Sequence, residues 1–136
     1  MILVVDYEPA VLSLVKAILE GAGYAVLAAC NGQQALALCE SPNHSIDLLL
    51  TDINIPDISG LELACRVSEM APRVSVLFMA GCRTGSQGLE FLRRNGPFSD
   101  CAVISKPFTS RELLGQITAA VSTAPCASTE LKPAVS

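Results

Sequence analysis

The chain has 136 residues, of which 51% are hydrophobic, and its formal net charge is −4 at pH 7. This length and apolar content predict one domain with one sizeable core. Because a negative chain has no broad positive field, we expect no direct binding of nucleic acid. The first residues lack a basic leader, and the longest uncharged stretch is interrupted by polar residues and glycines. We therefore expect neither export nor a membrane segment, and a cytoplasmic location.

Short apolar runs alternate with longer amphipathic stretches, which predicts alternating strands and helices. The expected strands are residues 2–5, 24–28, 46–50, 74–79 and 101–104. They are apolar throughout, as are the strands of a parallel sheet that is covered on both faces. The sequence therefore predicts an α/β fold of five parallel strands and five helices. The alternation of apolar runs and amphipathic stretches stops near residue 122, so we expect a domain over residues 1–122 and a disordered tail over residues 123–136.

The expected helices carry start and stop signals. The first opens at Pro9 and stops at Gly21. Later starts show the capping box, in which a hydroxyl and a carboxylate three residues apart satisfy each other's main-chain N–H groups. Two full boxes and two weaker versions are present: Ser59 with Glu62, Thr109 with Glu112, Asn31 with Gln34, and Thr84 with Gln87. The last of these would begin the fourth helix, which glycines weaken.

Six cysteines are distributed along the chain, and no two of them have the short spacing of a zinc site. Most lie in apolar segments, where a free cysteine behaves as a small hydrophobe. We therefore expect buried, reduced thiols and neither disulfides nor a metal site built from sulfur.

Polar residues stand at the ends of three expected strands. Asp6 follows the first strand, Asp52 the third, and Lys106 the fifth. In an open parallel sheet, ligands bind outside the carboxyl ends of the strands, so these three side chains are expected to converge. Two carboxylates suit Mg²⁺, a lysine supplies a point charge for phosphate, and an aspartate so placed can attack phosphorus.

Each of the three residues has an ordinary structural alternative. Asp6 could cap the first helix, Asp52 could begin a turn, and Lys106 could be a solvated surface lysine. Independent turn residues have no reason to place two acids and a base at strand ends one, three and five. Their joint placement therefore favours a site for phosphoryl chemistry.

The residues around these three positions form a recognisable pattern. Together they resemble the receiver domain of response regulators, and the resemblance covers about residues 1–122. The middle segment is the most specific, because its Asp, Pro and Gly have the spacing of the family. The segments that carry the resemblance are Ile2–Pro9, Asp47–Gly60 and Lys106–Phe108.

The resemblance implies a sheet of order 2-1-3-4-5 and phosphorylation of Asp52 by a histidine kinase or phosphotransfer protein. It implies Mg²⁺ held by Asp6, Asp52 and the main-chain carbonyl of Asn54, with Lys106 stabilising the phosphoryl group. It also implies a cis peptide bond before Pro107.

The sequence departs from the family at three positions. Tyr7 stands where a second metal-binding aspartate is usual, so we expect weak Mg²⁺ binding, with Glu8 as a longer substitute ligand. Ala80 stands where a Thr or Ser hydroxyl contacts the phosphoryl group, and one lost donor slows transfer by about 10²-fold. Val103 replaces the aromatic residue or histidine that usually works with that hydroxyl.

These features favour a stand-alone phosphoacceptor that passes its signal to a downstream protein, with at most self-catalysed transfer and dephosphorylation rather than classical enzyme activity. The alternative is a pseudo-receiver, a protein-binding module without efficient phosphorylation. A hydrolase using Asp52 would need an acid two residues on, where Asn54 stands. The kinase, the downstream partner and the existence of a homodimer are left open by the sequence.

Overall fold

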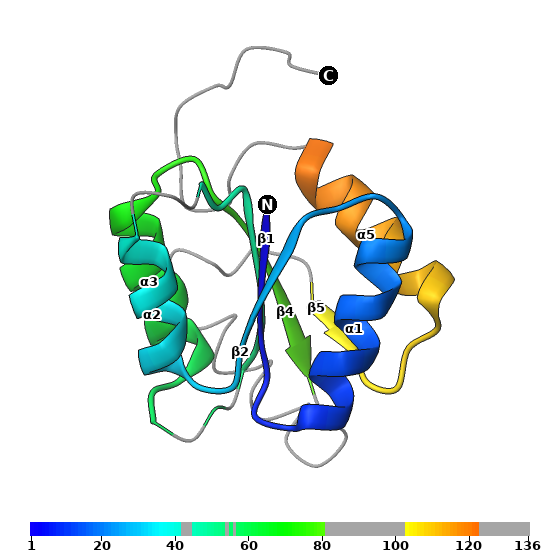
Figure 1. The fold of residues 1–136 in the computed structure, drawn as a ribbon, viewed down its shortest axis with the longest axis horizontal. Coiled ribbons are helices and arrows are strands. Elements are labelled where there is room, and N and C mark those ends of the chain that lie inside the picture. Colours follow the sequence, from blue (N-terminus) through cyan, green and yellow to red (C-terminus); the bar gives the residue numbers. More distant parts are fainter. Residues whose placement is uncertain (42–44, 54, 56, 81–102, 123–136) are drawn as a thin grey trace.

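In the part of the chain that the structure describes, a five-stranded parallel sheet lies between two pairs of helices (Figure 1). The computed structural model describes residues 1–41, 45–53, 55, 57–80 and 103–122. The expected tail and the expected fourth helix, which would begin near Thr84, lie outside the described residues.

The strands run β2-β1-β3-β4-β5 across the sheet, and every neighbouring pair is parallel. The order implied by the resemblance is therefore confirmed. β2 lies on one side of β1, whereas β3, β4 and β5 follow on the other side. The direction of the chain across the sheet therefore reverses between β1 and β3, and in such sheets ligands bind at the carboxyl ends of the strands at this point. The strands are β1 (Ile2–Val5), β2 (Val26–Ala29), β3 (Leu48–Asp52), β4 (Ser75–Ala80) and β5 (Val103–Ser105).

The third strand lies two residues further along the chain than the sequence predicts. Its last residues, Thr51 and Asp52, are polar, and the hydrophobic pattern excludes them for that reason. In the structure Thr51 is paired with Val5 and Phe78, and Asp52 with Met79, in the ladder. Strand pairing uses main-chain groups, so a polar side chain at a strand end does not prevent it. Asp52 is thus part of the sheet.

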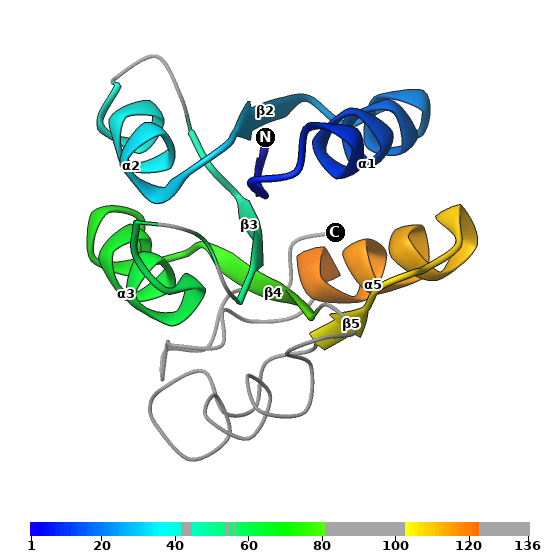
Figure 2. The ribbon, with the colours of Figure 1, turned by 90° about the horizontal axis from the view of Figure 1, so that it is seen from below.

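Helices cover both faces of this sheet. α1 and α5 pack on one face, and α2 and α3 pack on the other (Figures 1 and 2). Their bounds are α1 (Pro9–Gly21), α2 (Gly32–Glu40), α3 (Gly60–Met70) and α5 (Ser110–Ser122). No helix in the described part of the chain has both the length and the apolar content needed to cross a bilayer.

The two faces of β1 show how the core is divided. Leu3 and Val5 belong to the cluster under α2 and α3, whereas Ile2 and Val4 belong to the cluster under α1 and α5. Because successive side chains of a strand point to opposite faces, both sets must be apolar when both faces are covered. This is why the strands lack an alternating pattern.

The capping boxes form to different degrees. At α5, Thr109 N–H donates to Glu112 Oε1 and Glu112 N–H donates to Thr109 Oγ1, so the box is complete. At α3, Ser59 Oγ accepts from the N–H of Glu62, but the Glu62 carboxylate pairs with Arg66. At α2, Asn31 caps Gln34, whose side chain in turn accepts from the N–H of Cys30. The weaker signal at α2 therefore marked the start of a helix whose N-cap side chain does form its hydrogen bond.

The described cysteines are free thiols, as expected, but they are not all buried. Cys39 and Cys65 are half-buried, and burial raises the pKa of both thiols. Cys30 is exposed, so the expectation of burial is wrong there. Cys30 lies in the short connection between β2 and α2, where its main-chain N–H donates to the side chain of Gln34.

The chain turns sharply after β3, and a glycine makes this turn possible. The N–H of Gly60 donates to the carbonyl of Ile53 at 2.7 Å, which closes the segment between β3 and α3. A Cβ atom on Gly60 would collide with the main-chain oxygen of Asp52 and lie 2.9 Å from the Cα of Ile53. Both obstacles are backbone, which cannot move aside easily. Only glycine allows α3 to start this close to the end of β3.

Replacing Gly60 by Ala is expected to lower the free energy of unfolding by about 2 kcal/mol, because the new methyl group forces the backbone apart. Gly115, inside α5, is the matched control, since a Cβ there meets nothing within 4 Å. Gly115→Ala is expected to stabilise the protein by about 0.5 to 1 kcal/mol through helix propensity. Urea unfolding of the two variants measures both values. Equal changes in the free energy of unfolding for Gly60→Ala and Gly115→Ala would contradict the backbone contact at Gly60.

Candidate functional site

The three residues predicted from the strand ends do converge. Lys106 Nζ lies 2.5 Å from Asp6 Oδ2 and 2.9 Å from Asp52 Oδ2. Asp6 is fully buried, and Asp52 is 5% exposed. One ammonium therefore links two carboxylates that come from positions 46 residues apart in the chain, at the carboxyl ends of β1 and β3.

Asp6 combines the role expected at the site with a local structural role. Its Oδ2 pairs with Lys106, while its Oδ1 accepts a hydrogen bond of 2.9 Å from the N–H of Glu8, just before α1. The sequence offered helix capping and site chemistry as alternatives. The bond from Glu8 N–H is a local turn contact and does not cap the helix, since Glu8 is itself the N-cap residue of α1 and no side chain caps it. The local bond holds the carboxylate toward Lys106.

Lys106 is fixed from the main chain outward. Its N–H donates to the carbonyl of Ala80 at 2.8 Å, which ties the residue to the end of β4. The Lys106–Pro107 peptide bond is cis, as the resemblance implied. From this anchor the long side chain extends across the end of β4 to reach β3 and β1.

The charge of Lys106 follows from a balance of two effects. Burial favours the neutral amine, but hydrogen bonds to Asp6 and Asp52, together with their negative charges, outweigh it. The pKa of Lys106 therefore lies above its ordinary value of 10.5. The ammonium is charged at neutral pH, and the three side chains together carry one net negative charge. Such a pocket attracts a cation.

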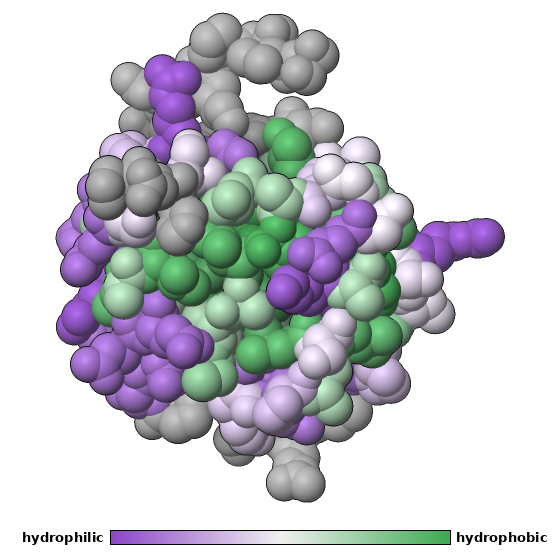
Figure 3. Space-filling view, viewed as in Figure 1, coloured by the Kyte–Doolittle hydropathy of each residue, from purple (hydrophilic) through white to green (hydrophobic). Residues whose placement is uncertain are grey.

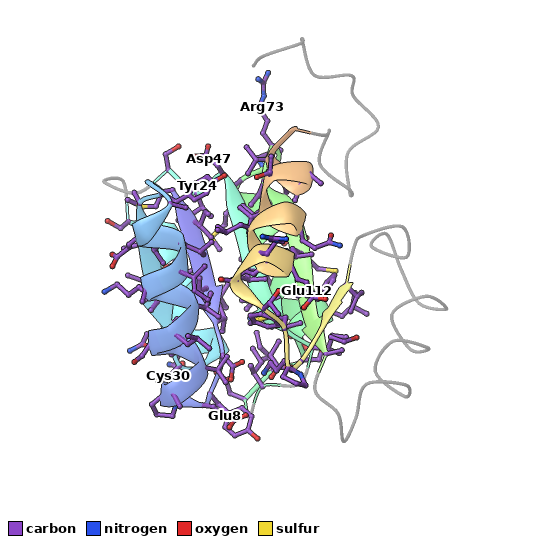
Figure 4. All side chains as sticks on the ribbon, turned by 90° about the vertical axis from the view of Figure 1, so that its right-hand side faces the viewer. Glu8, Tyr24, Cys30, Asp47, Arg73 and Glu112 are labelled. Atoms are coloured by element: carbon purple, nitrogen blue, oxygen red, sulfur yellow. The ribbon has the colours of Figure 1, made fainter. Side chains whose placement is uncertain are left out.

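The departures from the family lie where the sequence placed them. Tyr7 is 52% exposed, next to Asp6, and Ala80 closes β4 with 5% exposure. Val103 begins β5 and packs against the core under α2 and α3. Figure 4 shows Glu8 at the carboxyl end of the sheet, at the same end as Cys30. Asn54 lies outside the described residues.

The donor set at this edge fits Mg²⁺. Two buried carboxylates within reach of one another supply the hard oxygens that this ion prefers, and it completes its shell with water and phosphate oxygens. Among the residues that the structure describes, no third acidic, histidine or cysteine side chain joins them to form a group of three. A site with two carboxylates is consistent with weak binding.

The contacts made by Asp57 were not predicted from the sequence. This residue lies between β3 and α3, and its carboxylate accepts hydrogen bonds from the first N–H groups of α2. Oδ1 lies 2.9 Å from Gly32 N, and Oδ2 lies 2.8 Å from Gln33 N. Oδ1 also accepts from the N–H of Ile58 at 3.0 Å. The pairing joins residues 25 positions apart, and its only local trace in the sequence is the glycine at the first residue of α2.

With the fold and the site in place, comparison with known proteins identifies the family. Residues 2–118 match the sequence profile of the response regulator receiver domain. The chain belongs to this family, which functions in two-component signalling.

Individual relatives agree with this assignment. The chain is 40% identical to the response regulator receiver protein CpdR of Brucella abortus over 105 residues, which are 76% of this chain and 81% of that protein. It is 34% identical to the uncharacterized transcriptional regulatory protein YrkP of Bacillus subtilis over 118 residues, 87% of this chain, and spans 48% of that protein. A CheY-like receiver domain structure from Methanospirillum hungatei matches with a TM-score of 0.73, 32% identity and coverage of 88% and 91%.

Replacing Lys106 by Met should leave two buried carboxylates without their shared cation, so the free energy of unfolding is expected to fall by about 3 kcal/mol at pH 7. Lys16→Met is the matched control, because Lys16 is exposed on α1. Its expected effect is within about 0.5 kcal/mol. Urea unfolding of both variants measures the difference. A Lys106→Met protein as stable as the control would refute the pairing.

The contacts of Asp57 also predict an acid dependence of stability. The hydrogen bond from Gly32, together with those from Gln33 and Ile58, holds the pKa of Asp57 below 3.8, against partial desolvation. A carboxylate with a lowered pKa stabilises the folded state above its unfolded pKa, and this stabilisation disappears as the pH falls through the folded pKa. The stability gap between wild type and Asp57→Asn is therefore expected to be constant above about pH 5 and to narrow below about pH 3.8. Urea unfolding across this range tests the expectation, and a gap independent of pH would contradict it.

Proposed function

We propose that this receiver domain accepts a phosphoryl group on Asp52 from a histidine kinase or a histidine phosphotransfer protein, and that it does so slowly. The observation that carries the proposal is the arrangement of Asp52, Asp6 and Lys106 around one point at the carboxyl edge of the sheet. Asp52 is the nucleophile because it closes the central strand β3 and keeps a small exposed surface there.

In the proposed reaction, a carboxylate oxygen of Asp52 attacks the phosphorus of the donor's phosphohistidine. A P–O bond forms as the P–N bond breaks, and the imidazole of the donor leaves with the electron pair. The Lys106 ammonium, already close to Asp52 Oδ2, stabilises the negative charge that spreads over the phosphoryl oxygens. Asp6 holds the ammonium in place from the other side.

Mg²⁺ is part of this proposal. Asp6, Asp52 and the main-chain carbonyl of Asn54 would hold the ion. The sequence offers Glu8 as a longer substitute ligand, but among the described residues its carboxylate does not join those of Asp6 and Asp52 in a group of three. When bound, it neutralises charge between the carboxylates and the incoming phosphoryl oxygens. Tyr7 offers a neutral phenol in place of a carboxylate, so the affinity for Mg²⁺ is expected to be low.

A pseudo-receiver that binds a protein without being phosphorylated is the second candidate. Two observations favour it: Tyr7 supplies no carboxylate, and Ala80 supplies no hydroxyl at the end of β4. The three charged residues favour phosphorylation, because a binding module has no need to bury two carboxylates around a lysine.

The setting of the domain is proposed from its relatives. The chain covers 81% of CpdR, which is described as a receiver protein, and this supports a stand-alone component that signals to a downstream protein. The proposed location is the cytoplasm. The chain spans only about half of YrkP, whose described role as a transcriptional regulatory protein is not transferred to this chain.

Acetyl phosphate with Mg²⁺ is expected to produce one hydroxylamine-sensitive phosphate per chain, slowly, and none in Asp52→Asn. Ala80→Thr restores a hydroxyl donor and is expected to raise the rate by up to about 10²-fold. Tyr7→Asp restores a carboxylate for Mg²⁺. Both groups act on one phosphoryl group, so the double variant should exceed either single variant and the two effects should couple. Labelling rates measured by mass spectrometry test this.

Each matched control has a side chain of the same shape as the restoring substitution but lacks its hydroxyl or its charge. Ala80→Val fills the volume of Thr without a hydroxyl, and Tyr7→Asn has the shape of Asp without its charge. Neither is expected to accelerate labelling. If the double variant gains nothing while its fold and its Mg²⁺ binding are intact, the pseudo-receiver becomes the better description.

A further inference from the structure

The segment that leaves Asp52 is attached to the rest of the molecule at its base and at its tip. At the base, the N–H of Ile53 donates to the carbonyl of Met79, and Gly60 packs against the main chain of Asp52. At the tip, Asp57 binds the first turn of α2. Between the two, Ile55 is 8% exposed and packs into the core.

The attachment at the tip is both polar and apolar. The Asp57 carboxylate uses both of its oxygens on N–H groups that would otherwise lack partners at the start of a helix, where the helix dipole also favours a negative charge. Beside it, the side chain of Ile58 lies against Gly32 so closely that a Cβ atom there would come within 2.5 Å of Ile58 Cγ1. Two neighbouring residues therefore fasten one segment to α2.

Asp57 is not needed merely to cap α2. Asn31 accepts from the N–H of Gln34, and the carbonyl of Asn31 accepts from the N–H of Ala35, so the helix has its own local cap. Gln33 and Gln34, in the first turn of α2, are exposed, whereas Gly32 is buried. Figure 3 shows hydrophilic residues gathered over the lower part of α2. The Asp57 contact therefore adds to this local cap, and it also joins α2 to the segment that follows Asp52.

We propose that Asp57 is a positioning residue for the phosphorylation site: by binding the first turn of α2 it keeps the chain that leaves Asp52 in the conformation that Mg²⁺ binding requires. The inference rests on the proposed function, because it assumes that the site binds Mg²⁺. Partners of this kind, which orient metal ligands without touching the metal, change metal affinity by about 10- to 100-fold when they are removed.

The test compares three variants in the intact domain. Asp57→Ala removes the whole contact, and Asp57→Asn is the milder change, since an amide can accept at one position only. Asn31→Ala is the matched control, because the Asn31 side chain also binds an N–H in the first turn of α2, but its hydrogen bonds go to Gln34 and Cys30 and not to the described residues after Asp52. Urea unfolding confirms that each variant is folded under the conditions of the titration.

Titration with Mg²⁺ alone, followed by amide NMR signals of the residues around Asp6 and Asp52, gives the dissociation constant. Asp57→Ala is expected to weaken Mg²⁺ binding by about tenfold and Asp57→Asn by less, while Asn31→Ala stays within about twofold of wild type. With acetyl phosphate, Asp57→Ala should need more Mg²⁺ for half-maximal labelling but reach the rate of wild type at saturation. A merely structural role would lower stability without this shift.

Each outcome decides between the two proposals. Unchanged Mg²⁺ affinity in folded Asp57→Ala overturns the positioning role and leaves the proposed function intact. If wild type binds Mg²⁺ and Asp57→Ala weakens it, but wild type is never labelled, the positioning role is supported and the proposed function fails. Absence of Mg²⁺ binding in wild type overturns the positioning role.

Discussion

The ammonium of Lys106, shared between the carboxylates of Asp6 and Asp52, is the interaction on which the arrangement of this domain depends. Two acids can be buried at adjacent strand ends only if a cation lies between them. That cation comes from a strand at the far edge of the sheet, so the order of the strands and the bond from Lys106 N–H to Ala80 must both be right for the pocket to form. The site and the topology therefore constrain each other.

Much of this could be predicted from the sequence, because it depends on patterns that are local in the chain. Continuous apolar runs identify strands that are buried on both faces, and polar residues at their ends locate the site once a parallel sheet is assumed. The bounds of β3 could not be predicted in this way, since Thr51 and Asp52 join the ladder through main-chain groups, which the side-chain pattern does not report. The contact between Asp57 and α2 could not be predicted either, because it joins a loop to the start of a helix, and the two become neighbours only after the sheet has formed.

Two glycines mark positions in the sequence where such non-local contacts exclude a side chain. The lack of a side chain at Gly60 leaves room for the main chain at the end of β3, and the lack of a side chain at Gly32 leaves room for Ile58 at the start of α2. Neither has a positive φ, so neither is required by its own backbone. Each is required by an approach from elsewhere in the fold. A glycine at the first residue of a helix was therefore the one local trace of the missed contact, but its meaning depends on the tertiary structure.

Ala80 has a consequence for timing under the proposed function. Transfer onto Asp52 and hydrolysis of the resulting acyl phosphate both pass through a state in which charge spreads over the three equatorial oxygens. A side chain without a hydroxyl stabilises that state in neither direction, so both rates fall together. Because both rates fall, the steady-state fraction of phosphorylated protein changes little, whereas the time needed to reach that fraction increases. A receiver with alanine at this strand end responds slowly and retains its signal after the input has stopped.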